Sequence, residues 1–324
     1  METQDLNSMS HSVPVVSVAI TTYNSEKWLP RALDSVLAQR TSFPIEIVIG
    51  DDGSQDATIR VAASYRDQGG TTIRILQRPE NVGIQRNYYE TFGLCQGKYI
   101  AWLDADDYWT DPEKLETQVQ VMESDPTINL CGHFVREVTP DGTVVQEKYP
   151  SRPPGRYGLE DVLRGLFMST PSIMFRSGIQ RDLPQWYFDL APMTDKPIYL
   201  LAALSGGIVL IDRVMADYVL TPGSANTSKG ELFWYQTDVR FYEYMESILP
   251  AQWLRLARSI KGKQYEAVAY CLRKQGEFTA SRVAALKAFC SPSLLDNIGS
   301  KSKALLAAVV REAQWRLRSG KTAN

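Results

Sequence analysis

The sequence predicts an α/β fold built on a mostly parallel, doubly wound sheet, followed by a helical C-terminal extension. Strand-like apolar runs alternate with helix-like segments through the first 124 residues, and polar loops follow each run. Only helical periodicity remains after residue 230. The chain has 324 residues, 44% of them hydrophobic, which suffices for a large buried core. We expect a disordered N-terminus at 1–12, a sheet domain at 13–228 and a helical region at 229–324.

The first four strands and helices follow from hydrophobic periodicity. Short runs rich in β-branched residues predict strands, and apolar residues at helical spacing predict the helices between them. The predicted strands are 15–20, 45–49, 72–76 and 99–103, and the predicted helices are 25–39, 56–65, 84–95 and 112–124. Strand–helix repeats give parallel strands, so ligands are expected at the carboxyl ends of the strands.

The pattern changes after Asn129. Strand-like segments at 130–138 and 143–146 flank Pro140-Asp141-Gly142, which is typical of a hairpin. The sheet domain is completed by a short helix, a strand at 172–175, a helix at 196–204 and a strand at 208–211. In the helical region, residues 264–288 indicate one helical hairpin.

Composition excludes several classes of protein. A net charge of −2 argues against nucleic acid as the main partner. The four cysteines lie far apart without a CxxC or Cys/His cluster, which indicates buried or free thiols in a reducing compartment. The longest apolar stretch, 198–211, is shorter than the about 20 residues that a bilayer span needs. We therefore expect a cytoplasmic protein, either soluble or peripheral on the inner face of the membrane.

Charge is unevenly distributed along the chain. Residues 251–324 hold fourteen Lys/Arg and four Asp/Glu, a net charge of +10. The preceding 250 residues hold 21 Lys/Arg and 33 Asp/Glu, a net charge of −12. Near the C-terminus, Leu306, Val310, Ala313 and Leu317 form an apolar stripe. This stripe can pack on the protein's own core, which is the commoner arrangement, or lie on a membrane surface.

Three carboxylates within four residues follow the predicted strand 99–103. Asp104 and Asp106 lie on one face of an extended backbone, because side chains at i and i+2 point the same way. Such a pair suits a divalent metal that also binds phosphate oxygens. The alternative is an acidic loop before a helix, since Asp111-Pro112-Glu113 resembles a helix start.

Four segments together resemble the family 2 glycosyltransferases, inverting enzymes of the Rossmann-like GT-A fold. The segments are Val15 to Asn24, Asp51-Asp52-Gly53-Ser54, Asn81 to Asn87, and Leu103 to Asp107. Each segment alone is a weak signal, and the four in this order carry the resemblance, which covers about residues 13–228.

The resemblance implies a site for a nucleotide-sugar donor. Tyr23 offers a flat face for a base, and Asp52 can accept a hydrogen bond from a pyrimidine imide, although a surface aromatic and an Asp-Gly turn explain both equally well. Gly83 would let a nucleotide approach the backbone, and Arg86 can neutralise phosphate or form a structural ion pair. The expected donor-binding residues are Thr22, Tyr23, Asn24, Glu26, Asp51, Asp52, Asn81, Gly83, Arg86, Asp104 and Ala105.

The resemblance also implies the metal ligand and the base. Asp106 is expected to bind Mg²⁺ or Mn²⁺ directly, with Asp104 as a possible second ligand, and Asp107 and Trp109 are expected on the acceptor side. Trp109 can instead simply cover the core. Asp195, at the start of the helix 196–204, corresponds to the general base of the family, although capping that helix would explain it too.

One position departs from the family pattern. Family members often carry Tyr-Arg-x-His near the end of this domain, and the chain has Tyr218-Val219-Leu220-Thr221. Threonine is a poor metal ligand, so weak metal affinity or an unusual donor follows as a hypothesis.

A competing class of enzyme, a sugar-nucleotide pyrophosphorylase, would need a glycine-rich loop after the first strand, which Thr21 to Ser25 does not provide.

The expected function is transfer of a sugar from a nucleotide-diphosphate donor to a glycan or lipid-linked acceptor. A UDP-sugar is the leading candidate for the donor. The expected context is synthesis of a cell-envelope or surface polysaccharide, with peripheral membrane contact through the basic C-terminal helices as a possible addition. The alternative is a non-catalytic nucleotide-sugar or glycan-binding protein with a degenerate metal site.

Overall fold

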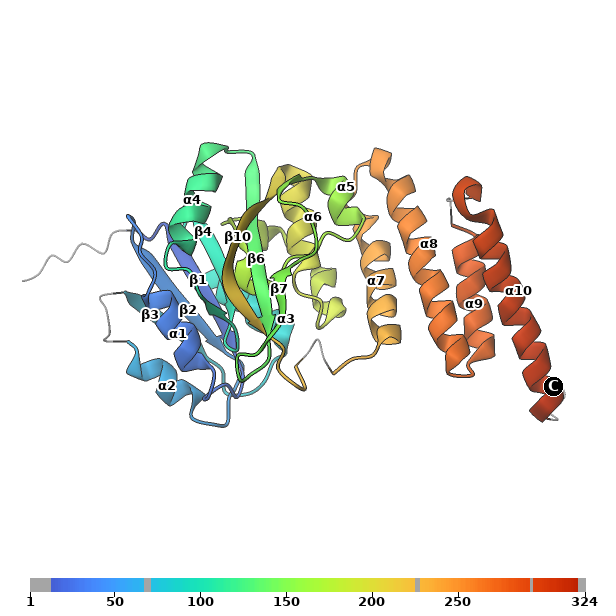
Figure 1. Cartoon of the computed structure of the whole chain (residues 1–324), viewed down its shortest axis with the longest axis horizontal. Coiled ribbons are helices and arrows are strands. Elements are labelled where there is room, and N and C mark those ends of the chain that lie inside the picture. The colour runs from blue at the N-terminus through green and yellow to red at the C-terminus, as the bar shows by residue number, and fades with distance from the viewer. Residues whose placement is uncertain (1–12, 67–70, 225–227, 292–293, 320–324) are drawn as a thin grey trace, which may run out of the picture. The chain divides into compact units, whose positions relative to one another are not determined.

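The computed structural model describes residues 13–66, 71–224, 228–291 and 294–319, and these form two compact units (Figure 1). Unit 1 is formed by the chain up to Gly158 and by Phe167–Gln185 and Thr194–Thr221, whereas unit 2 is formed by Leu159–Leu166, Trp186–Met193 and the chain from Pro222. Two short segments of unit 2 therefore interrupt unit 1, which the proposed division at residue 228 did not include. The N-terminus expected to be disordered lies outside the described residues.

Unit 1 contains a mixed sheet of ten strands in which most residue pairs are parallel. The path of neighbouring strands is β3-β2-β1-β4-β9-β6-β10-β5, with β7 beside β6 and β8 beside β10. The strands are β1 (Val16–Thr22), β2 (Ile45–Asp51), β3 (Thr72–Gln77), β4 (Tyr99–Asp104), β5 (Tyr108–Trp109), β6 (Ile128–Val138), β7 (Val144–Tyr149), β8 (Gly155–Tyr157), β9 (Met174–Arg176) and β10 (Gly207–Val219). This arrangement confirms the predicted fold class.

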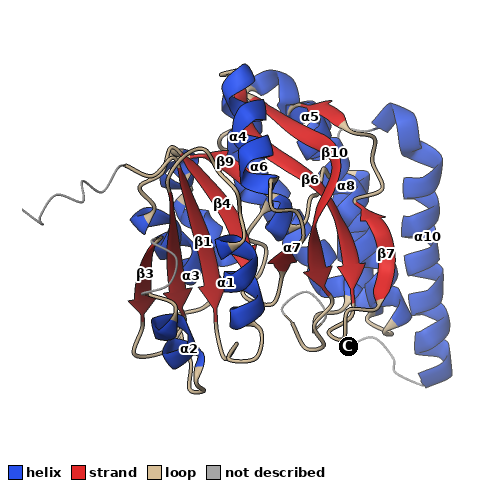
Figure 2. Cartoon of the chain, turned by 60° about the vertical axis from the view of Figure 1, so that its left-hand side comes forward, coloured by secondary structure: helices blue, strands red, loops and turns tan. Residues whose placement is uncertain are grey.

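Helices cover both faces of the sheet (Figure 2). The α-helices of unit 1 are α1 (Leu29–Leu37), α2 (Thr58–Ser64), α3 (Ile84–Leu94), α4 (Lys114–Ser124) and α6 (Lys196–Ser205), and its 3₁₀ turns include η1 (Thr170–Ser172) and η2 (Ile179–Asp182). Alternation along the strands divides the core. On one face Leu33 of α1 packs with Ile20 and Leu103. On the other face the rings of Trp102 and of Phe92 in α3 pack edge to face, with their centroids 5.1 Å apart.

Unit 2 consists of helices. These are α5 (Leu159–Leu163), η3 (Gln185–Leu190, which begins in unit 1), α7 (Glu231–Met245), α8 (Ala251–Lys274), α9 (Phe278–Phe289) and α10 (Leu294–Ser319). Helices α8 and α9 form the hairpin predicted at 264–288, and Gly276 supplies the positive φ of +83° at its turn. Among the described helices, none combines the length and the apolar character that crossing a bilayer requires.

The largest differences from the predicted elements lie around β5 and β10. The predicted strand 208–211 extends to Val219, because register shifts near Ile211 and Val214 let β10 continue beside β6 past the exposed Asp212 and Arg213. The two-residue strand β5 was not predicted, and it pairs antiparallel with β10 directly after the Asp104–Asp107 loop. The sheet thereby brings the acidic loop beside residues more than 100 positions later.

Candidate active site

The predicted acidic loop lies where the strand order of the sheet reverses. β1 has β2 and β3 on one side and β4 on the other, all parallel, and its residue Thr21 is in register with Asp104. The carboxyl ends of β1 and β4 therefore meet, which is the place where open α/β sheets bind ligands. Asp104 ends β4, and Asp106 and Asp107 follow in the turn before β5.

Three hydroxyl groups hold the Asp104 carboxylate. Its Oδ1 atom accepts hydrogen bonds from Thr21 Oγ1 at 3.0 Å and from the Tyr88 hydroxyl, and its Oδ2 atom accepts one from Thr170 Oγ1 at 2.8 Å. These donors come from β1, α3 and η1. Burial nevertheless raises the pKa of Asp104 above its ordinary value, and the three hydrogen bonds oppose that rise. The carboxylate is thus fixed in place by the protein alone.

Asp106 has fewer protein partners and a strongly perturbed acidity. Burial, followed by the like charge of Asp104, raises the pKa of Asp106 to about 6. A hydrogen bond with the Thr221 side chain opposes this rise. Thr221 therefore lies beside the predicted metal ligand, at the position where the family often places a histidine. A nearby cation would favour the ionised form of Asp106.

Asp107 is turned into the protein. Its Oδ1 atom accepts a hydrogen bond of 2.7 Å from the backbone amide of Val219, whereas its Oδ2 atom is buried and has no partner among the described residues. Burial and the neighbouring acids raise its pKa well above the ordinary value. Asp107 was expected on the acceptor side. Its hydrogen bond instead joins the acidic loop to Val219, which ends β10 and lies two residues before Thr221.

Trp109 is also buried. Its indole Nε1 donates to the carbonyl oxygen of Pro171 at 2.9 Å, and the Nζ atom of Lys114 lies 3.8 Å from the centroid of a Trp109 ring. The ring belongs to the core cluster on the α1 side of the sheet. This placement matches the simpler of the two interpretations, in which Trp109 covers the core.

A four-residue segment, 168–171, connects the predicted base with the acidic loop. At its start, the carbonyl oxygen of Met168 accepts a hydrogen bond of 2.5 Å from the Tyr199 hydroxyl of α6. Thr170 and Pro171 then bind Asp104 and Trp109 as described above. Because three residues span at most about 10 Å, α6 and the acidic loop are held close together.

Asp195 directly precedes α6 and is half-buried. Its side chain makes no capping hydrogen bond to the second or third residue of α6, but a backbone hydrogen bond from Lys196, the first residue of α6, acts on its carboxylate. Burial raises the pKa of Asp195, and Lys196 and a hydrogen bond with Tyr199 oppose the rise. Tyr149 lies close enough for the charge of Asp195 to help raise the Tyr149 pKa to about 12.

The first predicted donor loop is locked to the loop after β2. Asn24, with a positive φ of 48°, donates its backbone amide to Ser54 Oγ at 2.8 Å and accepts from the Gln55 amide at 2.8 Å. Glu26 accepts from the amide of Ala57, the residue before α2, at 2.8 Å. Tyr23 remains 49% exposed, so its ring is available for stacking.

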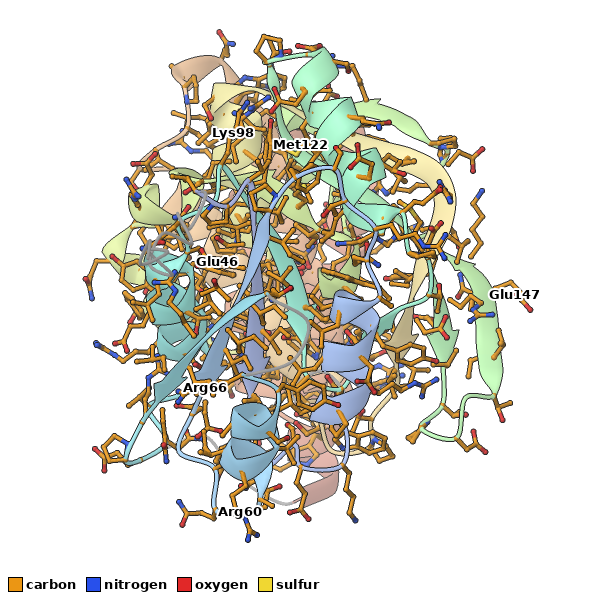
Figure 3. The ribbon with its side chains drawn as sticks, turned by 90° about the vertical axis from the view of Figure 1, so that its left-hand side faces the viewer. Glu46, Arg60, Arg66, Lys98, Met122 and Glu147 are labelled. Atoms are coloured by element: carbon orange, nitrogen blue, oxygen red, sulfur yellow. The ribbon has the colours of Figure 1, made fainter. Side chains whose placement is uncertain are left out.

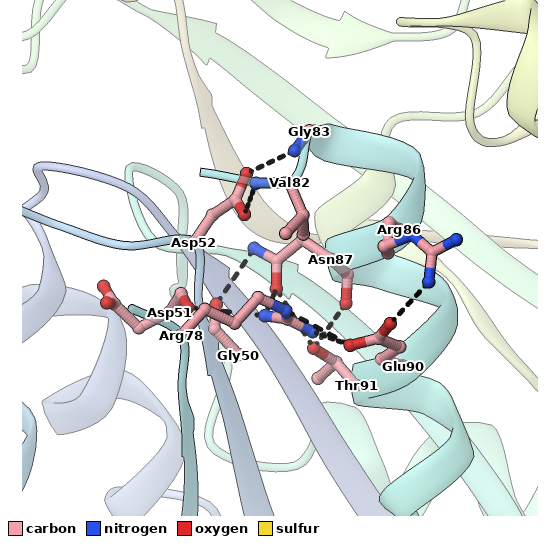
Figure 4. Close-up of polar contacts among 10 residues, drawn as sticks. All are labelled: Gly50, Asp51, Asp52, Arg78, Val82, Gly83, Arg86, Asn87, Glu90 and Thr91. Carbon is pink, nitrogen blue, oxygen red and sulfur yellow. Dashed lines mark hydrogen bonds and ion pairs between the residues drawn. The ribbon is translucent and has the colours of Figure 1, made fainter. Parts of the chain in front are cut away.

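Asp51 and Asp52 both bind backbone or side-chain groups of nearby loops. Asp51 accepts from the backbone amide of Ser54 at 3.0 Å. The two oxygens of Asp52 accept from the backbone amides of Val82 at 2.8 Å and Gly83 at 3.1 Å (Figure 4). The Gly83 amide is also 3.1 Å from the Asn81 side-chain oxygen. These contacts position the loop before α3, and carboxylate oxygens have further lone pairs for a ligand.

A buried arginine completes this side of the site. Arg78 binds the carboxylate of Glu90 at 3.0 Å and the side-chain oxygen of Asn87 at 2.6 Å (Figure 4). Arg86, which the sequence suggested for phosphate or for an ion pair, lies 3.2 Å from the other oxygen of Glu90. Thr22, another expected donor residue, has a buried hydroxyl without a partner in the described chain, and Ala105 is buried.

The donor set is compatible with a divalent metal. No group of three or more His, Cys, Asp or Glu side chains suited to a metal occurs among the described residues. A metal that also binds a diphosphate needs only one or two carboxylates from the protein. The raised pKa of Asp106 and its closeness to Asp104 fit such a site, because a cation would relieve the repulsion between two buried acids.

Sequence reasoning missed Tyr88, Thr170 and Arg78. Tyr88 belongs to the segment after Asn81-Val82-Gly83, and only α3 packing on β4 brings its hydroxyl to Asp104. Thr170 reaches Asp104 from 66 residues away. No local pattern identifies such a contact. Arg78 is buried, and a buried arginine is almost always paired, but nothing in the sequence around it indicates that burial.

Comparison with known proteins is consistent with this geometry. The family model described as "Glycosyl transferase family 2" matches residues 17–181. An uncharacterised protein of Mycobacterium tuberculosis is 32% identical over 207 residues, which are 63% of this chain and 58% of that protein. The chain thus spans less than two thirds of that relative. Chondroitin synthase of Pasteurella multocida is 32% identical over 143 residues, 44% of this chain and 14% of the synthase.

Solved structures share the fold at low sequence identity. Residues 1–349 of TarS from S. aureus, in complex with UDP-GlcNAc, align with a TM-score of 0.63 and 18% identity, covering 95% of this chain and 93% of that one. The mannosyltransferase PcManGT from Pyrobaculum calidifontis, in complex with GDP-Man and Mn²⁺, aligns with a TM-score of 0.56 and 16% identity, covering 92% and 86%. The acidic loop at the reversal of the sheet lies inside the segment that the family model matches, and the chain belongs to glycosyl transferase family 2.

Proposed function

We propose that the chain transfers a sugar from a nucleotide-diphosphate donor to a hydroxyl group of a glycan or lipid-linked acceptor. A UDP-sugar is the leading donor. The proposal rests most on Asp104 and Asp106, two acids held together at the carboxyl ends of β1 and β4, with the pKa of Asp106 raised to about 6. TarS with UDP-GlcNAc and PcManGT with GDP-Man and Mn²⁺ support the class of donor, with the nucleotide left open between them.

Asp195 is the proposed general base. Its raised pKa makes its carboxylate a stronger base than an ordinary aspartate near 3.9. The Asp195 carboxylate takes the proton of the acceptor hydroxyl while the acceptor oxygen forms a bond to the anomeric carbon. The bond from that carbon to the diphosphate breaks on the opposite face, and the electron pair leaves with the nucleoside diphosphate. A single displacement of this kind inverts the configuration of the sugar.

Asp106 is the proposed ligand of Mg²⁺ or Mn²⁺, with Asp104 beside it. When bound, the cation supplies a Lewis acid for the charge that develops on the leaving diphosphate. The protein's own part is to keep Asp104 oriented through Thr21, Tyr88 and Thr170, so that the carboxyl pair is preorganised before the donor arrives.

The donor nucleotide is proposed to lie between the loops after β1, β2 and β3. Tyr23 supplies an exposed ring on which a base can stack, worth about 1–3 kcal/mol. Asp52 both fixes the amides of Val82 and Gly83 and can accept from an imide N–H of a pyrimidine. The positive φ of Gly83, +93°, and the open space around its Cα allow a ligand to approach.

The proposed setting is the synthesis of a cell-envelope or surface polysaccharide in the cytoplasm. Cysteines Cys95, Cys131, Cys271 and Cys290 are all free thiols, as a reducing compartment would keep them. The competing proposal is a non-catalytic binding protein, and the specific observation in its favour is Thr221 beside Asp106 where the family often has histidine.

Release of nucleoside diphosphate tests the function. The protein is incubated with UDP-, GDP- and dTDP-sugars and Mn²⁺, with and without lipid-linked acceptors, after thermal-shift screening has selected the donors that bind. We expect release with one nucleotide class. Donor binding without release under every condition would support the binding protein instead.

Two variants separate the proposed roles. Asp195→Asn should keep the thermal shift with donor and lose transfer, whereas Asp106→Ala should lose both transfer and the response to Mn²⁺. The matched control is Asp212→Asn, because Asp212 is 62% exposed and its ion pair, with the half-exposed Lys148 at 2.6 Å, lies on the surface. Transfer by Asp195→Asn at the wild-type rate would remove the base assignment.

A further inference from the structure

Unit 2 carries a concentration of exposed apolar side chains. Of the fourteen large apolar residues that are exposed in the described chain, seven lie in residues 251–324, which make up less than a quarter of the sequence. Six of the seven belong to the neighbouring helices α9 and α10, and we call them the α9–α10 apolar residues. They are Val283, Leu286, Phe289, Val309, Val310 and Trp315.

The core cluster of unit 2 does not include these side chains, although the ring centroids of Trp315 and Phe278 lie 6.0 Å apart. The core beside α9 is built from Ala284 and Ala285 with Val239, Val268 and Ala269. Helix α10 reaches this core through Leu305 and buries Ala308. Of the apolar stripe predicted in α10, Val310 is exposed, and the side chains of Leu306, Ala313 and Leu317 lie outside the described part. Packing on the protein's own core therefore does not account for Val310, Val283 or Leu286.

Positive charge accompanies the exposed apolar residues. Residues 278–319 hold seven Lys/Arg and two Asp/Glu, a net charge of +5. One of the two acids, Glu312, is only 4% exposed and lies 3.2 Å from Arg282, so it is turned inward and paired. Lys287 of α9 and Lys303 and Arg311 of α10 are exposed. Exposed apolar and exposed basic side chains thus occur together on both helices.

We propose that α9 and α10 dock on an anionic lipid bilayer through the α9–α10 apolar residues. Helices with exposed apolar side chains and basic flanks lie in the lipid interface, where each Lys or Arg near an anionic surface adds about 1 kcal/mol. Trp315 has the amphipathic ring that is enriched at this interface. A second copy of the chain is a poorer occupant, because it would bring an equally positive surface against this one. The absence of a membrane-spanning helix among the described residues is consistent with peripheral docking.

Vesicle flotation tests the proposal without any sugar donor. The full chain is mixed with vesicles of phosphatidylcholine alone or with 30% phosphatidylglycerol, at low and high salt. We expect binding to the anionic vesicles, at least tenfold weaker binding to neutral ones, and weakening in high salt because the charges are screened. Because no transfer is measured, failure here leaves the proposed enzymatic function untouched.

Paired variants test the two components of the surface. Val283→Ser with Leu286→Ser should weaken anionic binding about tenfold or more, whereas Val144→Ser with Val145→Ser, at exposed positions of β7, should not. Lys287→Gln with Arg311→Gln should weaken it about twenty-five-fold, since about 1 kcal/mol per charge is about fivefold each. Its control is Arg60→Gln with Arg66→Gln, at the exposed arginines in and just after α2 (Figure 3).

Trp315 gives a direct optical readout. Anionic vesicles carrying brominated lipid tails should quench part of the tryptophan fluorescence, and Trp315→Phe should lose that part among the seven tryptophans. Three results would overturn the proposal: no binding to anionic vesicles, equal binding to both lipids, or binding that the unit 2 variants leave unchanged. A stable oligomer in solution that Val283→Ser with Leu286→Ser dissociates would also overturn it, by showing that a second copy covers these residues. Circular dichroism melting of each variant verifies that it is folded.

Discussion

Thr170 Oγ1 lies 2.8 Å from Asp104 Oδ2, which joins a 3₁₀ turn to the end of β4 across 66 residues of sequence. The same turn begins two residues after Met168, whose carbonyl oxygen accepts from Tyr199 of α6. A short, hydrogen-bonded segment therefore connects α6 with the acidic loop. Asp195, the proposed base, directly precedes α6, so base and acidic loop are positioned by one local structure.

Tyr88→Phe tests the hydroxyl that holds Asp104. The substitution removes one of three donors to a buried carboxylate and leaves the ring contacts of Tyr88 with Phe92 and Trp102 in place. A hydrogen bond to a charged group contributes about 1.5–3 kcal/mol. We expect kcat/KM to fall roughly tenfold to hundredfold, and the melting temperature to fall as well, because the hydrogen bond also stabilises the folded protein. Tyr89→Phe, the half-exposed neighbour, is the control, and equal kcat/KM for both variants would show that Tyr88 does not position Asp104.

Thr221→His tests the departure from the family pattern. The Thr221 side chain lies at Asp106, so an imidazole placed there reaches the proposed metal position. We expect the Mn²⁺ concentration for half-maximal turnover to fall about tenfold or more. Thr221→Val, which removes the hydroxyl without adding a ligand, is the matched control. Wild-type turnover that already saturates at trace Mn²⁺ would contradict weak metal binding.

The elements around the site could be predicted because their signals are local. The strands that end at Asp51 and Asp104 are visible as short apolar runs, and the turns that follow them as polar loops. The family resemblance, confirmed by the family model, added the order of the loops. Roles assigned through it, such as that of Asp195, remain predictions.

The contacts that fix the acids could not be predicted from the sequence. Asp106 and Asp107 are adjacent in the same acidic loop. Asp107 nevertheless accepts a hydrogen bond from the amide of Val219, 112 residues later, because β5 pairs with β10. Strand pairing of this range depends on the whole sheet. The partners of Asp52 were ambiguous for another reason: an Asp-Gly turn and a ligand contact use the same residue types.

His133 should make the protein sensitive to acid. This histidine is buried on β6, and burial, with Lys114 as a second cause, lowers its pKa from 6.5 to about 3. Between these values the unfolded chain binds a proton that the folded chain refuses, so the free energy of unfolding falls as the pH decreases from 6.5 towards 3. From pH 6.5 to 4.5, His133 alone should lower the free energy of unfolding by about 2 kcal/mol.

Urea unfolding at several pH values measures this effect. Asp104 and Asp107 act in the opposite sense, because their folded pKa values are raised, and their contribution to stability is lost as the pH rises. The His133 contribution is therefore taken as the difference between wild type and His133→Gln. As the pH falls below 6.5, we expect the free energy of unfolding to decrease more for wild type than for His133→Gln. A constant difference from pH 7 to 4.5 would mean that folding does not lower the pKa of His133.

Gly50→Ala should damage the site through crowding. A Cβ atom at Gly50 would lie 1.8 Å from Thr91 Oγ1 and 2.6 Å from Asn87 Oδ1, so α3 must move away from β2. Asn87 is the partner of Arg78, and Tyr88 on the same helix holds Asp104. We expect a loss of about 1–3 kcal/mol in stability, as for other overpacked sites, together with a loss of transfer.

Gly83→Ala separates crowding from backbone strain. At Gly83 nothing lies within 4 Å of an added Cβ, but the φ of +93° is unfavourable for alanine. That strain should cost about 1–3 kcal/mol and leave the packing of α3 intact. Adding Thr91→Ala to Gly50→Ala should restore part of the stability and of the transfer rate, since it removes the nearest clash, whereas adding it to Gly83→Ala should restore neither. If Thr91→Ala gave the same change in both backgrounds, close contact between α3 and β2 would not be what places Tyr88 at Asp104.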